Sequence, residues 1–338
     1  MKKKRKIFEA TEAMHNLLRT SGSMNANESA LAMAEIAKAL ELPLRQGIMS
    51  GEILNGIYEP IPLINNASAE FPLDFLAPGT EKDFVAYSIP NHGYIPQRHV
   101  EGDYVMLPTY DIGNSIGWNL KYARDARWDV IRRASEVFEG GFVKKLNDDG
   151  MQTILAAAAD RNIIVLDSDA GAGQFTKRVV SLGKTIMRRN GGGNSTSNSR
   201  GKLTDIFMSP EGVEDIRNWN VDQVDEVTRR EIFVAEGDGA MSRIFGVNLH
   251  DLDELGEGQE YQLFYENELG GSLPAGDVEI AIGLDLSNRD SFVMPMKGQV
   301  QVFDDPTLHR MRRAGVYGWL ENVGFGVLDG RRVILMSF

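Results

Sequence analysis

The sequence predicts an α+β fold organised around one long helix, with strands dominating the C-terminal part. Residues about 119–140 repeat apolar side chains at helical spacing, and charged residues fill the other faces. Residues 301–338 alternate aromatic and aliphatic residues with glycines, a pattern typical of strands joined by tight turns. The expected buried stripe of the helix consists of Ala126, Val130, Ala134, Val137 and Phe138.

Composition limits the classes of protein that this chain can belong to. Its 338 residues are 42% hydrophobic and 25% charged, which is ordinary for a globular protein of one elaborated domain or two. A net charge of −12 argues against a general nucleic-acid binder, because phosphate contacts require a surplus of Lys and Arg. The chain contains no cysteine, which excludes disulfides, thiolate metal sites and a cysteine nucleophile.

A basic run opens the chain and is followed by a segment that Glu9, Glu12, His15 and Arg19 interrupt, so no apolar signal core is expected. No stretch of the sequence has the apolar length of a membrane span. The basic run is either a solvated tail or a contact for an acidic partner such as DNA or a scaffold. It consists of Lys2, Lys3, Lys4, Arg5 and Lys6.

The region before the long helix is predicted to project from the rest of the chain. Two short helices are expected at 8–20 and 27–41, and a proline-punctuated extended arm is expected from 47 to 78. Strands at 83–89 and 104–109 enclose a polar segment rich in Gly and Pro, which predicts a long hairpin without a core of its own. Such segments bury too little surface alone, so they are expected to lie on their own body or on a neighbouring subunit.

After the long helix, Asp148 and Asp149 are expected to cap a second helix at about 151–159, followed by a strand at 162–169.

The glycines that follow this strand resemble nucleotide-binding motifs only weakly. The third glycine position after Gly171 and Gly173 is Thr176. The tripeptide at 183–185 has the tail of a P-loop, but it is predicted to lie within a helix, where backbone amides cannot converge on a phosphate.

Helix and turn signals continue to the C-terminus. Ser209, Pro210 and Glu211 predict the start of a helix that extends to Trp219, and a further helix is expected at 221–232. Residues 244–290 predict short strands with acidic turns, whose carboxylates do not follow the spacing of a calcium-binding loop. The pair at 329–330, Asp-Gly, predicts a hairpin turn between the last two strands.

Catalytic motifs are missing from the sequence. The pentapeptides GxSxG and HExxH do not occur, and the five histidines have no spacing that suggests metal ligands. The sequence therefore predicts a protein that is not an enzyme and has no catalytic, cofactor-binding or metal-binding residues.

The order of these parts resembles the major capsid protein of tailed double-stranded DNA bacteriophages, the Hong Kong 97-like fold. The segments KLTDIFMSPEGVEDIRNW and GVYGWLENVGFGVLDGRRV carry the resemblance most specifically, and the arm, hairpin and long helix support it by their order. The resemblance implies an N-terminal arm at 1–77 and an E-loop hairpin with its base at 78–118. It implies a P-domain at 119–204 with a spine helix at about 119–140, an A-domain at 205–300, and shared C-terminal strands at 301–338.

The implied function is structural: self-assembly into pentamers and hexamers of an icosahedral virion shell that encloses phage DNA, formed in the cytoplasm of the host bacterium. Implied partners are other copies of the chain, portal and scaffolding proteins, possible cement proteins, and packaged DNA through non-specific contacts at residues 2–6. Projecting arms agree with this, since their burial against neighbouring subunits of a shell offsets the entropy lost on ordering them. The acidic balance also suits a container that must release its DNA.

Two departures from the family pattern accompany the resemblance. Some relatives begin with a scaffolding segment that a protease removes, whereas here the arm is expected to begin within a few tens of residues of Met1. Some relatives also cross-link an E-loop lysine to a neighbour, but Lys82 lies at the base of the predicted hairpin, so that chemistry is not inferred. The alternatives are an encapsulin-like cellular compartment and, from a different class, a nucleotide-dependent enzyme built on residues 162–185.

Overall fold

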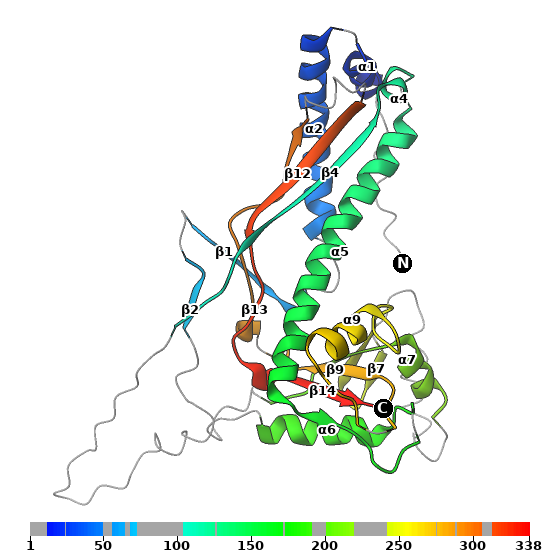
Figure 1. Cartoon of the computed structure of the whole chain (residues 1–338), viewed down its shortest axis with the longest axis vertical. Helices are drawn as coiled ribbons and strands as arrows, with labels where there is room; N and C mark the ends of the chain where they lie inside the picture. Colours follow the sequence, from blue (N-terminus) through cyan, green and yellow to red (C-terminus); the bar gives the residue numbers. More distant parts are fainter. Residues whose placement is uncertain are drawn as a thin grey trace, which may run out of the picture.

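The long helix and two separate sheets define the architecture of the chain (Figure 1). The structure is a computed structural model. It describes residues 12–23, 25–49, 56–64, 68–72, 104–125, 127–171, 173–190, 201–219, 242–274, 276–287, 289–305 and 313–338. The helix α5 (Trp128–Arg161) runs down most of the molecule and ends in a compact lower lobe (Figure 1).

The long sheet lies beside the upper half of α5, and its central pair is β4 (Tyr110–Asn119) and β12 (Arg313–Val323), which run antiparallel. Its strand order is β1-β10-β12-β11, and β4 joins β12 while β13 joins β10. The other members are β1 (Glu59–Pro62), β10 (Phe292–Met296), β11 (Gln301–Asp304) and β13 (Gly326–Val327). A separate pair, β2 (Glu70–Pro72) and β3 (Tyr104–Met106), lies at one side of this sheet (Figure 1).

The compact sheet forms the core of the lower lobe in the order β5-β14-β9-β6-β8-β7. Its apolar strands pack against α6 (Lys177–Asn190) and α7 (Pro210–Arg217) in a cluster that includes Val180, Ile206 and Met336. The short helix α9 (Glu260–Leu263) continues as the π-helix η2 (Phe264–Glu268), which contacts α5. The strands are β5 (Ile164–Val165), β6 (Asp205–Met208), β7 (Ser242–Ile244), β8 (Val247–Asp251), β9 (Ile280–Leu284) and β14 (Val333–Ser337).

The long helix differs from its prediction at both ends. A separate short helix, α4 (Leu120–Arg124), precedes it and is capped by Asn119, whose side chain accepts a hydrogen bond from the backbone N of Lys121 at 2.9 Å. The helix α5 then continues to Arg161, so the predicted second helix at 151–159 is part of α5. The expected cap at Asp148 and Asp149 is therefore wrong, because both residues lie inside the helix.

The buried stripe of α5 is also displaced from the prediction. Val137 is 61% exposed, whereas Ile131, Phe138 and Phe142 are buried. Residues i, i+7 and i+11 share one face of a helix, and this face turns Val137 toward solvent. The prediction was right for Phe138 and wrong for Val137, and it left out Ile131, which is buried.

The N-terminal helices fold onto their own chain. The helix α1 (Glu12–Ser21) packs against α4, and α2 (Ala26–Met49) packs against β11 and α5, so α2 is longer than the predicted helix at 27–41. Arg124 donates from Nε to the carbonyl oxygen of Gly22 at 2.7 Å, which ties this helical pair to α4. Residues 47–49, predicted as the start of an irregular arm, are therefore helical. The predicted strand at 83–89 and helix at 221–232 lie outside the described residues.

Two further predictions about short elements need correction, and one is confirmed. The strand expected at 162–169 is reduced to the two residues of β5. The Asp329-Gly330 hairpin is wrong: β13 and β14 belong to different sheets, and the 3-10 helix η5 (Gly330–Arg332) leads from one to the other. Ser209 does cap α7, since its side chain accepts a hydrogen bond from the backbone N of Gly212 at 3.1 Å.

Polar contacts join the long sheet to the compact lobe. Arg332, only 2% exposed, pairs through Nη2 with Asp290 Oδ1 at 2.8 Å. Asp290 belongs to η3 (Arg289–Ser291), immediately before β10, while Arg332 immediately precedes β14. Arg161, the last residue of α5, donates to the carbonyl oxygen of Gly330 at 3.1 Å. These contacts hold together the start of β10, the start of β14 and the end of α5, and we call this place the junction.

Candidate assembly surface

One face of the long sheet carries aromatic side chains that no described helix covers. Gly318 of β12 faces α5, because a Cβ placed there would meet the rings of Phe138 and Phe142. Side chains alternate between the two faces of a strand, so Tyr317 and Trp319 point away from α5. Sequence alternation in β12 contained this signal, but the expectation for this segment did not assign its two faces.

The neighbouring strands extend the same face. Phe303 of β11 is paired with Tyr317, and their rings stack with centroids 5.4 Å apart. Phe303 is 41% exposed and Trp319 is 44% exposed, so both rings are available to a partner. On the other side of β12, Trp319 pairs with Gly113 and Tyr317 pairs with Ser115 of β4. We call Phe303, Tyr317 and Trp319 the aromatic face; it lies beside these small residues of β4.

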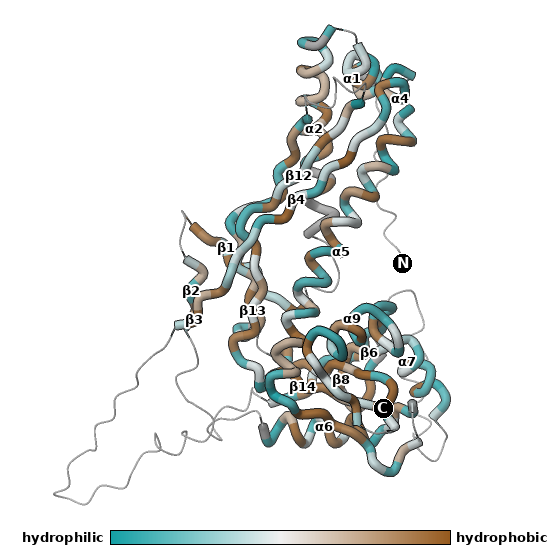
Figure 2. The backbone as a smooth tube through the Cα atoms, in the orientation of Figure 1, coloured by the Kyte–Doolittle hydropathy of each residue, from teal (hydrophilic) through white to brown (hydrophobic). Residues whose placement is uncertain are grey.

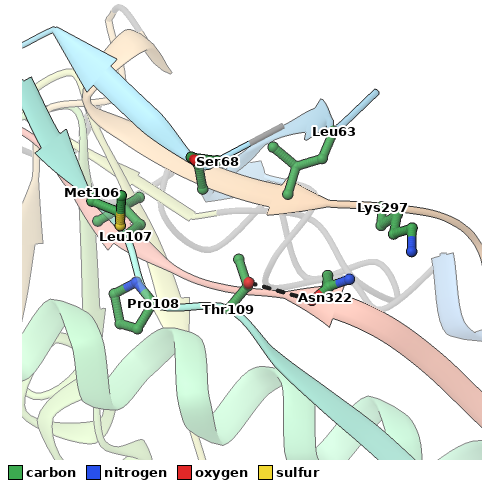
Figure 3. A pocket seen from close by; sticks show the side chains of 9 residues that line it. Leu63, Ser68, Met106, Leu107, Pro108, Thr109, Lys297 and Asn322 are labelled. Atoms are coloured by element: carbon green, nitrogen blue, oxygen red, sulfur yellow. Dashed lines mark hydrogen bonds between the residues drawn. The ribbon is translucent and has the colours of Figure 1, made fainter. Parts of the chain in front are cut away.

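A second apolar surface lies at the base of the segment 73–103, where the strands β2 and β3 meet β1. Ile64, Tyr104 and Met106 are between 65% and 71% exposed there. Beside them lies a pocket of about 360 Å³ that is lined by both apolar and polar side chains (Figure 3). One of these side chains, Lys297, pairs with Glu321 at 3.1 Å. The residues lining the pocket are Leu63, Ser68, Ala69, Met106, Leu107, Pro108, Thr109, Lys297 and Asn322.

The basic run Lys2, Lys3, Lys4, Arg5 and Lys6 lies outside the described residues, so its role as a DNA or scaffold contact stays a prediction.

The glycines of the two weak nucleotide-binding motifs, Gly171, Gly173 and Gly183, lie within the described residues. Gly183 lies inside α6, as predicted, and is buried against Met336 and Leu203. At the start of α6, Asp167 accepts a hydrogen bond from Thr176 Oγ1 at 2.7 Å and pairs with Arg178 at 3.2 Å. These contacts join the chain's own carboxylate to the start of α6.

Perturbed titratable groups in the compact lobe have structural explanations. Burial raises the pKa of Asp205, but hydrogen bonds from His250, Thr204 and Asn248 outweigh it and leave this pKa below its usual value. The ring of His250 stacks on Phe207 and its Nε2 lies 2.9 Å from Asp205 Oδ1. Burial, with the charges of Glu211 and Asp215, raises the pKa of Glu279, which accepts a hydrogen bond from Ser209. These groups hold neighbouring strands and α7 together.

Within the part of the chain that the structure describes, no group of three or more His, Asp or Glu side chains is arranged to hold a metal ion. Among the described helices, none combines the length and apolar character needed to cross a bilayer.

Comparison with known proteins identifies solved structures that share this architecture. No protein-family model matches the sequence, and a search of curated proteins found no match. Solved capsid structures do match. The capsid of an empty GTA particle aligns with a TM-score of 0.56 at 12% identity, covering 86% of this chain and 90% of that one. The cyanophage Pam1 capsid aligns with a TM-score of 0.56 at 14% identity, covering 83% and 88%.

A third match, the capsid of Myoviridae phage XM1, has a TM-score of 0.50 at 14% identity and covers 85% of this chain and 95% of that chain. The chain has the Hong Kong 97-like capsid fold. At identities this low the likeness is one of fold, and it extends along most of each chain. The fold predicted by resemblance is therefore confirmed, and the aromatic face lies on the sheet that flanks the long helix of this capsid fold.

Proposed function

We propose that this chain is the major capsid protein of a tailed phage and assembles into pentamers and hexamers of an icosahedral shell around double-stranded DNA. The aromatic face carries the proposal, because a chain with a capsid fold leaves Phe303 and Trp319 exposed on a sheet face that no described helix covers. Clustered aromatic residues are the side chains that dominate binding energy at protein interfaces. A second copy of the chain is the partner that a shell supplies.

The domain assignment is part of this proposal. Residues 1–77 are the N-terminal arm, 78–118 the E-loop and its base, 119–204 the P-domain, 205–300 the A-domain, and 301–338 shared strands. In this scheme α5 is the spine helix. The exposed residues Tyr104 and Met106 are then at the base of the E-loop, where a neighbouring subunit would cover them.

The partners follow from the same proposal. The shell would act in the virion after assembly in the host cytoplasm, with portal and scaffolding proteins, possible cement proteins and packaged DNA as partners. Lys2, Lys3, Lys4, Arg5 and Lys6 would contact DNA or scaffold, which a deletion of residues 2–6 tests through the amount of packaged DNA. In this role the protein needs no catalytic residue and no cofactor.

Particle size tests the proposal directly. The purified chain should form shells or discrete pentamers and hexamers by size-exclusion chromatography with light scattering, and electron microscopy should show closed particles. The double variant Phe303→Ser, Trp319→Ser should remain folded but lose these assemblies. The control Val137→Ser, also at an exposed apolar residue, should assemble normally.

A stable monomer over a wide range of salt and protein concentration would contradict the proposal. Equal assembly of the double variant and the control would show that the aromatic face is not an interface. Shells that enclose a protein cargo and no DNA would favour the encapsulin-like alternative. A thermal shift with nucleotide would support the enzyme alternative, since a ligand of the native state raises apparent stability.

A further inference from the structure

The exposed side of α6 carries a concentration of positive charge that the overall composition does not predict. The sequence of this helix, KRVVSLGKTIMRRN, contains five cationic residues and no carboxylate, in a chain whose net charge is −12. Hydrophobic and hydrophilic positions alternate along the helix, which borders the lower lobe (Figure 2). Lys177, Lys184, Arg188 and Arg189 are all exposed.

Packing fixes the direction of these charges. Val179, Val180 and Met187 are buried in the core of the compact lobe, so the opposite side of α6 must face outward. The ammonium group of Lys184 donates to the carbonyl oxygen of Phe245 at 2.7 Å, which holds it at the surface without neutralising its charge. The basic side is therefore a rigid feature of a packed helix.

The cations differ in how far the protein neutralises them. Arg178 pairs with Asp167 and Asp169, so its charge is already neutralised by carboxylates of the chain. For Lys184, Arg188 and Arg189, no described carboxylate forms an ion pair. An anion that approaches this end of α6 would meet three charges without displacing a described carboxylate.

The surface suits phosphate better than protein. No large apolar side chain of α6 is among the exposed hydrophobic residues, whereas protein interfaces concentrate aromatic residues and are depleted in Lys. Lys184 and Arg188 are one helical turn apart, or about 6 Å along the axis. Along one DNA strand, a phosphate and the second phosphate after it are about 7 Å apart, measured along the duplex axis. Consecutive cations can thus reach phosphates of the same strand.

We propose that the exposed side of α6, through Lys184, Arg188 and Arg189, contacts the phosphate backbone of the packaged double-stranded DNA. The inference rests on the proposed function, and it requires that this side of the compact lobe line the shell. The contact is independent of base sequence, because cationic side chains on one helix face read charge and not base edges. A small number of such contacts in each subunit leaves the DNA releasable, which agrees with the acidic balance of the chain.

Salt dependence of DNA binding tests the assignment. The variant Arg188→Gln, Arg189→Gln removes two charges, and the control Arg132→Gln, Arg133→Gln removes two exposed charges from α5. Binding of each purified protein to a fluorescent duplex of mixed sequence is measured by anisotropy between about 50 and 200 mM salt. The α6 variant should lower the slope of log K against log salt by about 2 relative to the wild type, and the control should not change it.

The outcomes separate the alternatives. Equal slopes for the wild type and the α6 variant would overturn the proposal, as would loss of all binding on deletion of residues 2–6 alone. Displacement of DNA by poly-glutamate at equal charge concentration would instead indicate an acidic protein partner. The single variant Arg189→Gln, with a melting curve for each protein, guards against misfolding and should show about half the change in slope. Particle size is measured separately, so wild-type protein that binds DNA but forms no shells contradicts the proposed function and not this contact.

Discussion

Gly318 of β12 lies directly against the ring of Phe138 in α5: a Cβ at this glycine would approach Phe138 Cζ to 2.5 Å. The close approach lets the long helix pack flat on the central strand pair of the long sheet. It also determines which side of β12 faces the solvent, and therefore where Tyr317 and Trp319 point. A residue without a side chain thus positions the aromatic face.

Replacement of Gly318 by alanine should destabilise the fold by about 1 to 3 kcal/mol, because the added methyl group overpacks a buried contact between two rings and a strand. Chemical denaturation monitored by circular dichroism would measure this. The matched control is Gly113→Ala on the adjacent strand β4, where a Cβ would meet only the carbonyl oxygen of Gly318 at 3.7 Å. The control should change stability by less than about 0.5 kcal/mol. Equal losses in the two variants would refute this account of Gly318.

In the middle of α5, in contrast, replacement of a glycine by alanine is expected to stabilise the fold. Gly140 lies within the helix, and a Cβ placed there has no other described atom within 4 Å. Alanine has a higher helix propensity than glycine, so Gly140→Ala should raise the free energy of unfolding by about 0.5 to 1 kcal/mol. Thermal melting of the wild type and the variant would detect the gain. A loss of stability would mean that the helix needs the freedom of glycine at this position.

The sequence predicted the class of the fold because its strongest signals are local. The amphipathic pattern of α5, the Ser209 cap and the glycine-punctuated C-terminal strands depend on neighbouring residues, and the structure contains all three. The continuity of α5 past Asp148 was missed, because a capping residue in sequence has the same identity as an acidic residue inside a helix. Here Asp148 accepts a hydrogen bond from the Tyr261 hydroxyl at 3.1 Å, a contact that joins α5 to α9.

Features that depend on distant contacts could not be read from the sequence. The Asp329-Gly330 pair has the residues of a hairpin turn, but its flanking strands join different sheets, and only the pairing partners of β13 and β14 decide that. The basic residues of α6, including Arg188 and Arg189, can be read from the sequence. Their significance depended on which side of the helix is buried, and tertiary packing alone determines this.

The stability of the fold should be sensitive to loss of the Asp290 carboxylate, which joins the long sheet to the compact lobe through Arg332. Asp290→Asn removes the charge opposite Arg332, whose side chain is 2% exposed, so a buried cation loses an ionic partner. We expect a loss of about 1 to 3 kcal/mol by chemical denaturation. Glu321→Gln breaks the exposed pair with Lys297 and should cost less than about 1 kcal/mol. Similar losses in both variants would show that the junction does not depend on the charge of Asp290.

Glu279 predicts a specific dependence of stability on pH. Burial, together with Glu211 and Asp215, raises the pKa of this carboxyl group in the folded state. The folded state therefore favours the protonated form, so the contribution of Glu279 is greatest below the usual glutamate pKa and is lost as pH rises through the raised pKa. Glu279→Gln keeps an acceptor for the Ser209 hydroxyl, and it should melt at a higher temperature than the wild type at pH 7 and at a similar temperature at pH 4. The control Glu214→Gln, at an exposed position of α7, should leave the melting temperature unchanged at both pH values. A constant difference between Glu279→Gln and the wild type across this range would contradict the shifted pKa.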